Sequence, residues 1–131
     1  MLSDKDLLAK AIEAQQRSYC PYSKFKVGAA LLTTSGTVYF GTNVENASYG
    51  LALCAERTAI FTAVAAGERT FEKLAVVCAC ESGCLPCGAC RQVMAEFAPN
   101  LNLILGTSDG GFRTTSLSVL LPQPFLPDHL A

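Results

Sequence analysis

The stretch CLPCGACRQ, residues 84–92, places three cysteines three residues apart and follows the last with an arginine. Pro86 suits a helix start, and the residues after it predict a helix over 86–98, before Pro99. A helix start carries unpaired N–H groups and a partial positive charge, which favour a thiolate. Two thiolates at C-x-x-C spacing can bind one tetrahedral zinc ion. The stretch therefore predicts part of a metal site as well as a helix.

A second predicted helix also begins with a cysteine. CAERTAIFTAVAAG, residues 54–67, has helical spacing of apolar residues and stops at a glycine, as C-capped helices do. If the two helices pack side by side on a sheet, Cys54 can join Cys87 and Cys90 as a third zinc ligand. Three protein ligands leave the fourth position open, which is typical of a catalytic zinc rather than a structural one.

Glu56 indicates what an open position would do. It lies two residues after Cys54, where its carboxylate can take a proton from a water at the metal and pass it to a leaving group. The alternative is an ordinary first-turn glutamate that complements the helix dipole. Because three thiolates make a zinc site negative, a nearby cation is expected, and Arg57 and Arg91 are the candidates for hydrogen bonds to sulfur.

The remaining elements alternate between helix and strand signals. An amphipathic helix comes first, two β-rich runs surround the Ser35-Gly36 turn, and a continuous apolar run predicts a strand buried on both faces. Two more strands surround a Ser-Asp-Gly-Gly turn. The predicted ranges are 4–18 for the helix and 25–34, 37–44, 73–80, 101–107 and 111–116 for the strands. The pattern predicts one α/β domain over residues 1–131, with a five-stranded mixed sheet covered by helices.

Composition limits the partners. Half of the 131 residues are apolar, and ten Lys and Arg against eleven Asp and Glu give a net charge of -1, which provides no basic field for nucleic acid. No apolar run approaches the roughly 20 residues that span a bilayer. Seven cysteines without an export signal indicate metal binding or catalysis in a reducing compartment. We therefore expect a soluble, cytoplasmic protein in which Cys20 and Cys78 are simply buried.

Four stretches carry a resemblance to a known family. CAERTAI and PCGACRQV, with YCPYSKFKVGAALL and NVENASYG, closely resemble the small, homotetrameric type of cytidine deaminase, nearly from end to end. The resemblance implies a three-layer α/β/α fold and one Zn²⁺ per subunit, with active sites shared between the subunits of a homotetramer. It also implies hydrolytic deamination of cytidine and 2′-deoxycytidine to uridine and 2′-deoxyuridine in pyrimidine salvage, with release of ammonia and with Glu56 as the proton shuttle.

The same resemblance assigns the substrate contacts. Phe25 matches a ring that packs near the base, and Asn43 and Glu45 match the pair that binds the ribose hydroxyls. Ala55 would offer a backbone group to the base. Phe125, in LLPQPF, matches an aromatic residue that the family inserts into a neighbouring subunit's site.

The stretch CACESGCLPC departs from the family pattern. Leu85 stands where a small polar residue is usual, and two further cysteines precede it. Cys80, Cys84 and Cys87 have the spacing of an iron–sulfur site in radical enzymes, but such enzymes need a larger barrel than 131 residues can form. The same three cysteines with Cys90 could instead form a closed structural zinc site in a binding module. A milder alternative is that Cys84 competes for the metal or oxidises with a ligand.

Other deaminase substrates are less compatible with the sequence. An editor of nucleic acid needs a basic groove, and a guanine-type deaminase more often has His at the position of Cys54. A deaminase of a nucleoside antibiotic shares the zinc motif, but NVENASYG favours an ordinary ribose. His129, the only histidine, has no motif around it and is expected to be exposed near the C-terminus.

Overall fold

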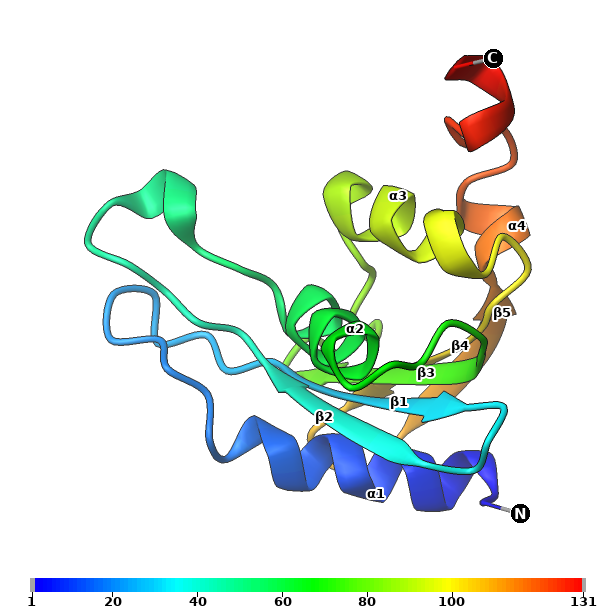
Figure 1. Ribbon diagram of the computed structural model, residues 1–131. Helices are drawn as coiled ribbons and strands as arrows, with labels where there is room; N and C mark the ends of the chain where they lie inside the picture. Colours follow the sequence, from blue (N-terminus) through cyan, green and yellow to red (C-terminus); the bar gives the residue numbers. More distant parts are fainter. Residues whose placement is uncertain (1, 131) are drawn as a thin grey trace.

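A five-stranded mixed sheet forms the centre of the computed structural model, which describes residues 2–130 (Figure 1). The strand order is β2-β1-β3-β4-β5, in which β3 and β4 run parallel and every other neighbouring pair is antiparallel. The strands are β1 (Gly28–Thr33), β2 (Val38–Thr42), β3 (Phe71–Cys78), β4 (Asn102–Thr107) and β5 (Phe112–Ser116). The helices are α1 (Asp4–Gln15), α2 (Ala55–Ala65), α3 (Gly88–Phe97) and α4 (Leu117–Leu120), with 3-10 turns η1 (Tyr49–Leu51) and η2 (Pro127–Leu130). The predicted order of elements and the mixed α/β sheet are confirmed.

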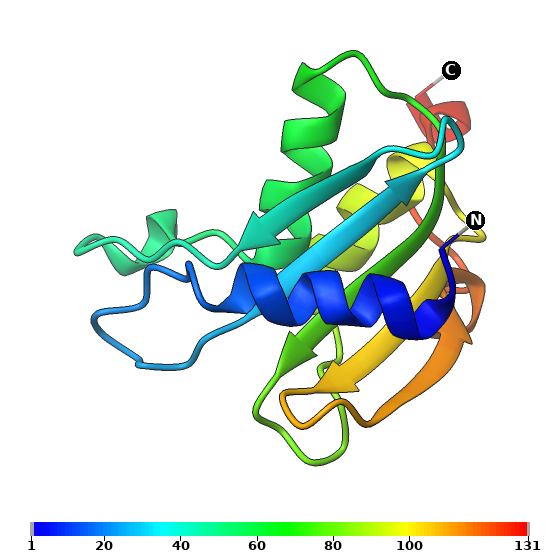
Figure 2. The same ribbon diagram turned by 90° about the horizontal axis from the view of Figure 1, so that it is seen from below.

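Helices cover both faces of the sheet and give three layers. Along β1, Ala29 and Leu31 belong to one core cluster, whereas Ala30 and Leu32 belong to the other, as alternation along a strand requires. The first cluster packs under α2 and α3, and the second packs against α1 on the opposite face (Figures 1 and 2). The three-layer α/β/α arrangement is therefore confirmed. Within residues 2–130, no helix is both long enough and apolar enough to cross a membrane.

Several elements end earlier than the sequence predicts, and specific contacts explain two of these differences. The first helix stops at Gln15 instead of residue 18, because Tyr19 is already extended and pairs with Val44 in an isolated β-bridge. The third strand stops at Cys78 instead of residue 80, because Cys80 begins a turn in which its carbonyl accepts from Gly83 N at 3.2 Å. Both corrections come from pairing and turn contacts that the pattern of apolar residues does not contain.

Close backbone packing fixes the start of α2 against the sheet. A Cβ atom at Gly41 of β2 would lie 2.1 Å from the carbonyl oxygen of Ala55 and 2.6 Å from the backbone nitrogen of Ala59. These are backbone atoms of the first turns of α2, so they cannot move aside as a flexible side chain can. Gly41 thus allows the helix to approach β2 closely and sets the position of Cys54, directly before Ala55.

We predict that Gly41→Ala lowers the free energy of unfolding by about 1–3 kcal/mol, because the new methyl group must displace the first turns of α2. Urea unfolding measures the change. Gly50→Ala is the matched control, since a Cβ there meets nothing within 4 Å, and it should change stability by no more than about 0.5 kcal/mol. Equal urea midpoints for the two variants would contradict the role given to Gly41.

Candidate metal centre and active site

Three sulfur atoms meet where α2 and α3 begin. Cys54 is the N-cap of α2, Cys87 is the N-cap of α3, and Cys90 lies in the first turn of α3. The sulfur of Cys87 lies 3.8 Å from that of Cys54 and 3.4 Å from that of Cys90, and all three lie within 4.8 Å of one another. Cys87 precedes the first turn in which the sequence had placed it, because its sulfur accepts from Cys90 N at 3.5 Å and so caps the helix.

The spacing of the sulfurs fits a zinc ion. A tetrahedral zinc with Zn–S bonds of about 2.3 Å separates its sulfur ligands by about 3.8 Å. The distances between the sulfurs here are close to that value, and the three cysteines come from two helix starts that both favour anions. The donor set and its geometry therefore match a zinc site with three thiolate ligands.

The protonation of the cluster also favours a cation. Hydrogen bonding from Cys90, with a further contribution from Arg57, lowers the pKa of Cys54 to about 5. The same contact with Cys54, together with burial, raises the pKa of Cys90. Cys54 thus loses its proton readily while Cys90 keeps its own, since two anionic sulfurs in contact repel each other. A divalent cation between the sulfurs removes that repulsion and allows all three to be thiolates.

Glu56 lies beside the cluster in the first turn of α2. Its side chain is only 3% exposed, and burial raises its pKa to about 7, with a smaller contribution from the charge of Cys54. Contact with the thiol of Cys90 acts in the opposite direction. A carboxyl group with a pKa near neutrality can both accept and release a proton at physiological pH, which is the property a general acid–base requires.

The two candidate arginines differ in what they contact. Arg57 donates from Nη2 to the sulfur of Cys54 at 3.5 Å, as the sequence predicts for a cation that offsets thiolate charge. Arg91 instead donates to two carbonyl oxygens, those of Pro86 at 2.8 Å and Leu120 at 2.9 Å. The predicted contact between Arg91 and sulfur is therefore wrong. Successive residues on a helix point about 100° apart, so Arg91, directly after Cys90, points away from the side of the helix where the Cys90 sulfur lies.

Asn43 organises the segment that carries Phe25. Its Oδ1 accepts from Val27 N at 2.9 Å and from the hydroxyl of Ser18, while its Nδ2 donates to the carbonyl of Phe25 at 2.7 Å. The ring of Phe25 is 42% exposed. The structure thus joins two of the predicted substrate contacts through one side chain.

Glu45 holds the neighbouring part of the same segment. Its carboxylate accepts from Tyr22 N at 3.0 Å, from Ser23 N at 3.1 Å and from the hydroxyl of Ser23. The Ser23 hydroxyl bond is the main reason that the pKa of Glu45 is lowered. The carboxylate lines a hollow of about 360 Å³, whose other walls include Asn46 and Tyr49. The sequence did not reveal these loop contacts, because they join residues without any shared periodicity.

The other predicted site residues lie in different surroundings. Ala55 is fully buried as the first residue of α2, between Cys54 and Glu56. Phe125 lies on the C-terminal segment beyond α4, where its ring is 56% exposed and stacks on His129 with centroids 5.5 Å apart. His129 is exposed, as the sequence predicts, but its stacking on Phe125 was missed.

The remaining cysteines stay outside the cluster. Cys20 and Cys78 are buried, which confirms the prediction for both. Among residues 2–130, the group of side chains that could hold a metal contains neither Cys80 nor Cys84. Cys80 is exposed on a turn, while Cys84 is buried against Cys78, and burial raises the pKa of Cys84. The structural site with four thiols is therefore not formed, because its members face different surroundings.

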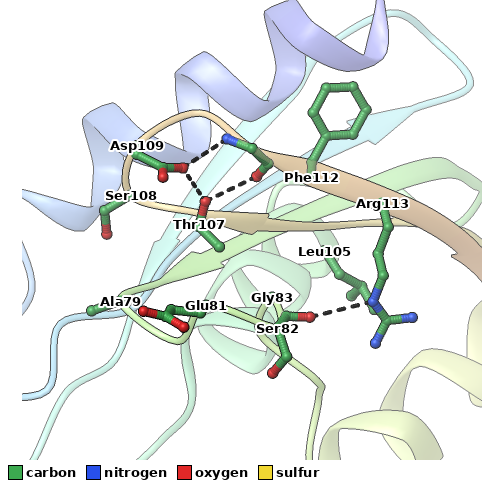
Figure 3. A pocket seen from close by; sticks show the side chains of 11 residues that line it. Ala79, Glu81, Ser82, Gly83, Leu105, Thr107, Ser108, Asp109, Phe112 and Arg113 are labelled. Carbon is green, nitrogen blue, oxygen red and sulfur yellow. Dashed lines mark hydrogen bonds between the residues drawn. The ribbon is translucent and has the colours of Figure 1, made fainter.

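A larger hollow, of about 700 Å³, lies beyond the carboxyl ends of β3 and β4 (Figure 3). Its polar groups mostly serve its own loops. Asp109 accepts from Gly111 N at 2.9 Å and from the hydroxyl of Thr107, and Arg113 Nε donates to the carbonyl of Ser82 at 3.3 Å (Figure 3). None of the predicted site residues lines it. The size of a hollow therefore does not mark the reactive site of this protein, whereas the chemistry of the sulfur cluster does.

Fold and site together define a class: a three-layer α/β protein with a three-thiolate zinc site and an adjacent buried glutamate has the architecture of zinc-dependent deaminases. The family model for the cytidine and deoxycytidylate deaminase zinc-binding region matches residues 1–105. The chain belongs to the cytidine and deoxycytidylate deaminase family.

Individual relatives agree with that assignment over nearly the whole chain. A cytidine deaminase from Sporosarcina psychrophila is 47% identical over 126 residues, which is 95% of this chain and 93% of the relative. One from Halalkalibacterium halodurans is 47% identical over 129 residues, 97% and 98% of the two chains. The crystal structure of cytidine deaminase from Burkholderia pseudomallei superposes with a TM-score of 0.92 at 50% identity and covers 95% of this chain and 100% of its own.

We predict that Cys54→Ser and Cys87→Ser each weaken zinc binding at least about tenfold, because each removes a sulfur from the cluster. Metal analysis after dialysis against a competing chelator measures the loss. Cys80→Ser is the matched control and should retain one zinc per chain, since Cys80 is exposed and outside the cluster. If the Cys80 variant lost zinc and the Cys54 variant kept it, the result would contradict the three-sulfur site and favour the structural site with four thiols.

Proposed function

We propose that this chain catalyses the hydrolytic deamination of cytidine and 2′-deoxycytidine to uridine and 2′-deoxyuridine, with release of ammonia. The observation that carries the proposal is the buried carboxyl group of Glu56, with a pKa near 7, beside a cluster of three sulfurs whose spacing fits zinc. Membership of the deaminase family supports the same reaction.

The roles of the residues follow from their surroundings. Cys54, Cys87 and Cys90 would hold the zinc ion, which when bound acts as a Lewis acid on water. Glu56 accepts a proton from the water whose oxygen bonds to C4 and transfers it to the ring nitrogen N3. It then moves the remaining hydroxyl proton at C4 to the amine, so that the C4–N bond breaks, ammonia leaves and the C4 carbonyl of uridine forms. Arg57 donates to the sulfur of Cys54 and would withdraw negative charge from the thiolates, so that a bound zinc ion would stay acidic enough to activate water.

Substrate binding involves the segment around Phe25. We assign the ribose hydroxyls to Asn43 and Glu45, the base to the ring of Phe25, and a further backbone contact with the base to Ala55. Both polar side chains are oriented by bonds to their own loop before a substrate arrives, so little ordering is needed on binding. Without a sugar these polar groups would lack partners, which would disfavour binding of the free base.

The assembly we propose is a homotetramer in which Phe125 of one subunit reaches the site of a neighbour. Two segments project from the body of the chain: the arm around η1, and the C-terminal segment (Figure 1). Both expose large apolar side chains, with Tyr49 76% and Leu51 67% exposed on the arm and Phe125 56% exposed on the C-terminal segment. Exposed apolar groups of this size are typical of surfaces that become covered on association.

The remaining proposals concern partners and location. We propose that residues 1–131 act as one domain, that nucleic acid is not a partner, because the net charge is -1, and that the enzyme is cytoplasmic. A site made of three reduced cysteines supports a reducing compartment.

We predict that Glu56→Gln retains zinc but releases ammonia from cytidine about 100- to 10,000-fold more slowly, because an amide cannot carry the proton. Ammonia release by the zinc-loaded protein measures turnover, and metal analysis of the same sample confirms the site. Wild-type turnover in this variant would remove Glu56 from the mechanism. Absence of release from the wild-type protein, with zinc bound, would overturn the proposed substrate.

We predict that Glu45→Gln raises KM for cytidine about 10- to 100-fold with little change in kcat, because a charged acceptor for a ribose hydroxyl is lost. Steady-state kinetics at several cytidine concentrations gives both constants. Ser23→Ala is the comparison variant: it removes the hydroxyl bonds to Glu45 and to Phe25 N but keeps the carboxylate, so its KM should rise less than that of Glu45→Gln. A change in kcat alone would contradict ground-state binding of the ribose.

A further inference from the structure

Gln92 binds the backbone of Phe125 in a two-point contact. Its Nε2 donates to the carbonyl oxygen of Phe125 at 2.6 Å, and its Oε1 accepts from Phe125 N at 3.1 Å. A side-chain amide has one donor and one acceptor group arranged like those of a peptide bond, so it pairs with Phe125 as a neighbouring strand would. A glutamate would place a second acceptor against the Phe125 carbonyl, and an aliphatic side chain would make neither bond.

Arg91 makes a second connection to the same segment. Its guanidinium donates to the carbonyl of Pro86, directly before Cys87, and to the carbonyl of Leu120, the last residue of α4. One side chain therefore joins the segment that carries a sulfur ligand to the start of the C-terminal segment. Gln92, the next residue, holds that segment five residues further on.

We propose that Arg91 and Gln92 are positioning residues that hold the C-terminal segment, residues 120–125, in one register on α3. Arg91 and Gln92 are the two residues after Cys90, so the position of Phe125 is tied to the helix whose start carries two of the three sulfurs. The inference rests on the proposed function, in which Phe125 of one subunit reaches a neighbour's substrate. We call these contacts of Arg91 and Gln92 with residues 120–125 the clamp, and its proposed effect on substrate binding passes through Phe125.

The stacking of His129 on Phe125 completes the arrangement. The two rings are 5.5 Å apart at centroid and inclined by 23°, and His129 N donates to the carbonyl of Leu126 at 2.9 Å. The backbone of Phe125 is thus fixed by Gln92 and one face of its ring is covered, while the ring remains more than half exposed. An exposed aromatic ring on a fixed backbone can enter a neighbouring site with little further loss of entropy.

The test compares Gln92→Met and Phe125→Ala, alone and together, in the zinc-loaded enzyme. We expect Gln92→Met to raise KM for cytidine about tenfold, the loss expected for two hydrogen bonds of ordinary net strength, with kcat within about twofold and zinc content unchanged. If Gln92 acts through Phe125, the double variant should have the same KM as Phe125→Ala alone. Gln92→Glu, which keeps the acceptor but not the donor, should also raise KM.

Gln123→Ala is the control, because it truncates a glutamine of the same segment that makes no side-chain hydrogen bond within residues 2–130. Its KM should equal that of the wild type. An unchanged KM for Gln92→Met beside a raised KM for Phe125→Ala would overturn the clamp and leave the role of Phe125 intact. Additive effects in the double variant would also overturn the clamp. An unchanged KM for Phe125→Ala would overturn both the clamp and the proposed role of Phe125.

Discussion

The contact between the sulfurs of Cys54 and Cys87, 3.8 Å apart, is the interaction on which the rest of the site depends. The two residues begin different helices, which follow β2 and β3 in the chain, and the C-terminal ends of these two strands lie at the same end of the sheet. Gly41 lets α2 approach β2, and the loop of residues 79–87 connects β3 to α3. Both sulfurs lie at helix N-termini, where the helix dipole favours anions, and the sulfur of Cys87 also accepts a hydrogen bond from Cys90 N.

Glu56 illustrates how two opposing effects are balanced at that position. A carboxylate in the first turn of a helix is stabilised by the helix dipole, which by itself would lower its pKa. Burial beside the thiols acts more strongly in the opposite direction, so the pKa rises to about 7. Arg57 meanwhile lies on the sulfur of Cys54 and offsets its charge. One helical turn thus supplies a metal ligand, an acid–base group and a counter-cation, each with a different environment.

The sequence predicted what depends on spacing along the chain and missed what depends on contacts across it. The C-x-x-C spacing and the glutamate two residues after Cys54 are local properties, and the structure agrees with both. The sequence predicted a contact between Arg91 and sulfur because Arg91 follows Cys90. That prediction was wrong because adjacency in sequence does not give direction around a helix. The sequence did not show whether Cys84 joins the metal site. Its burial against Cys78 depends on how the loop after β3 folds back, and no periodic pattern encodes that loop.

The loop contacts of Glu45 and Asn43 are compatible with sugar binding because they leave capacity unused. A carboxylate accepts about four hydrogen bonds, and Glu45 uses three of them on Tyr22 and Ser23. An amide nitrogen has two hydrogens, and Asn43 donates one to the carbonyl of Phe25. A hydroxyl group both donates and accepts, so in the proposed role a ribose hydroxyl would give its hydrogen to the carboxylate or take one from the amide. The bonds that hold the loop thus leave one acceptor position on Glu45 and one hydrogen on the amide of Asn43 for the proposed sugar contacts.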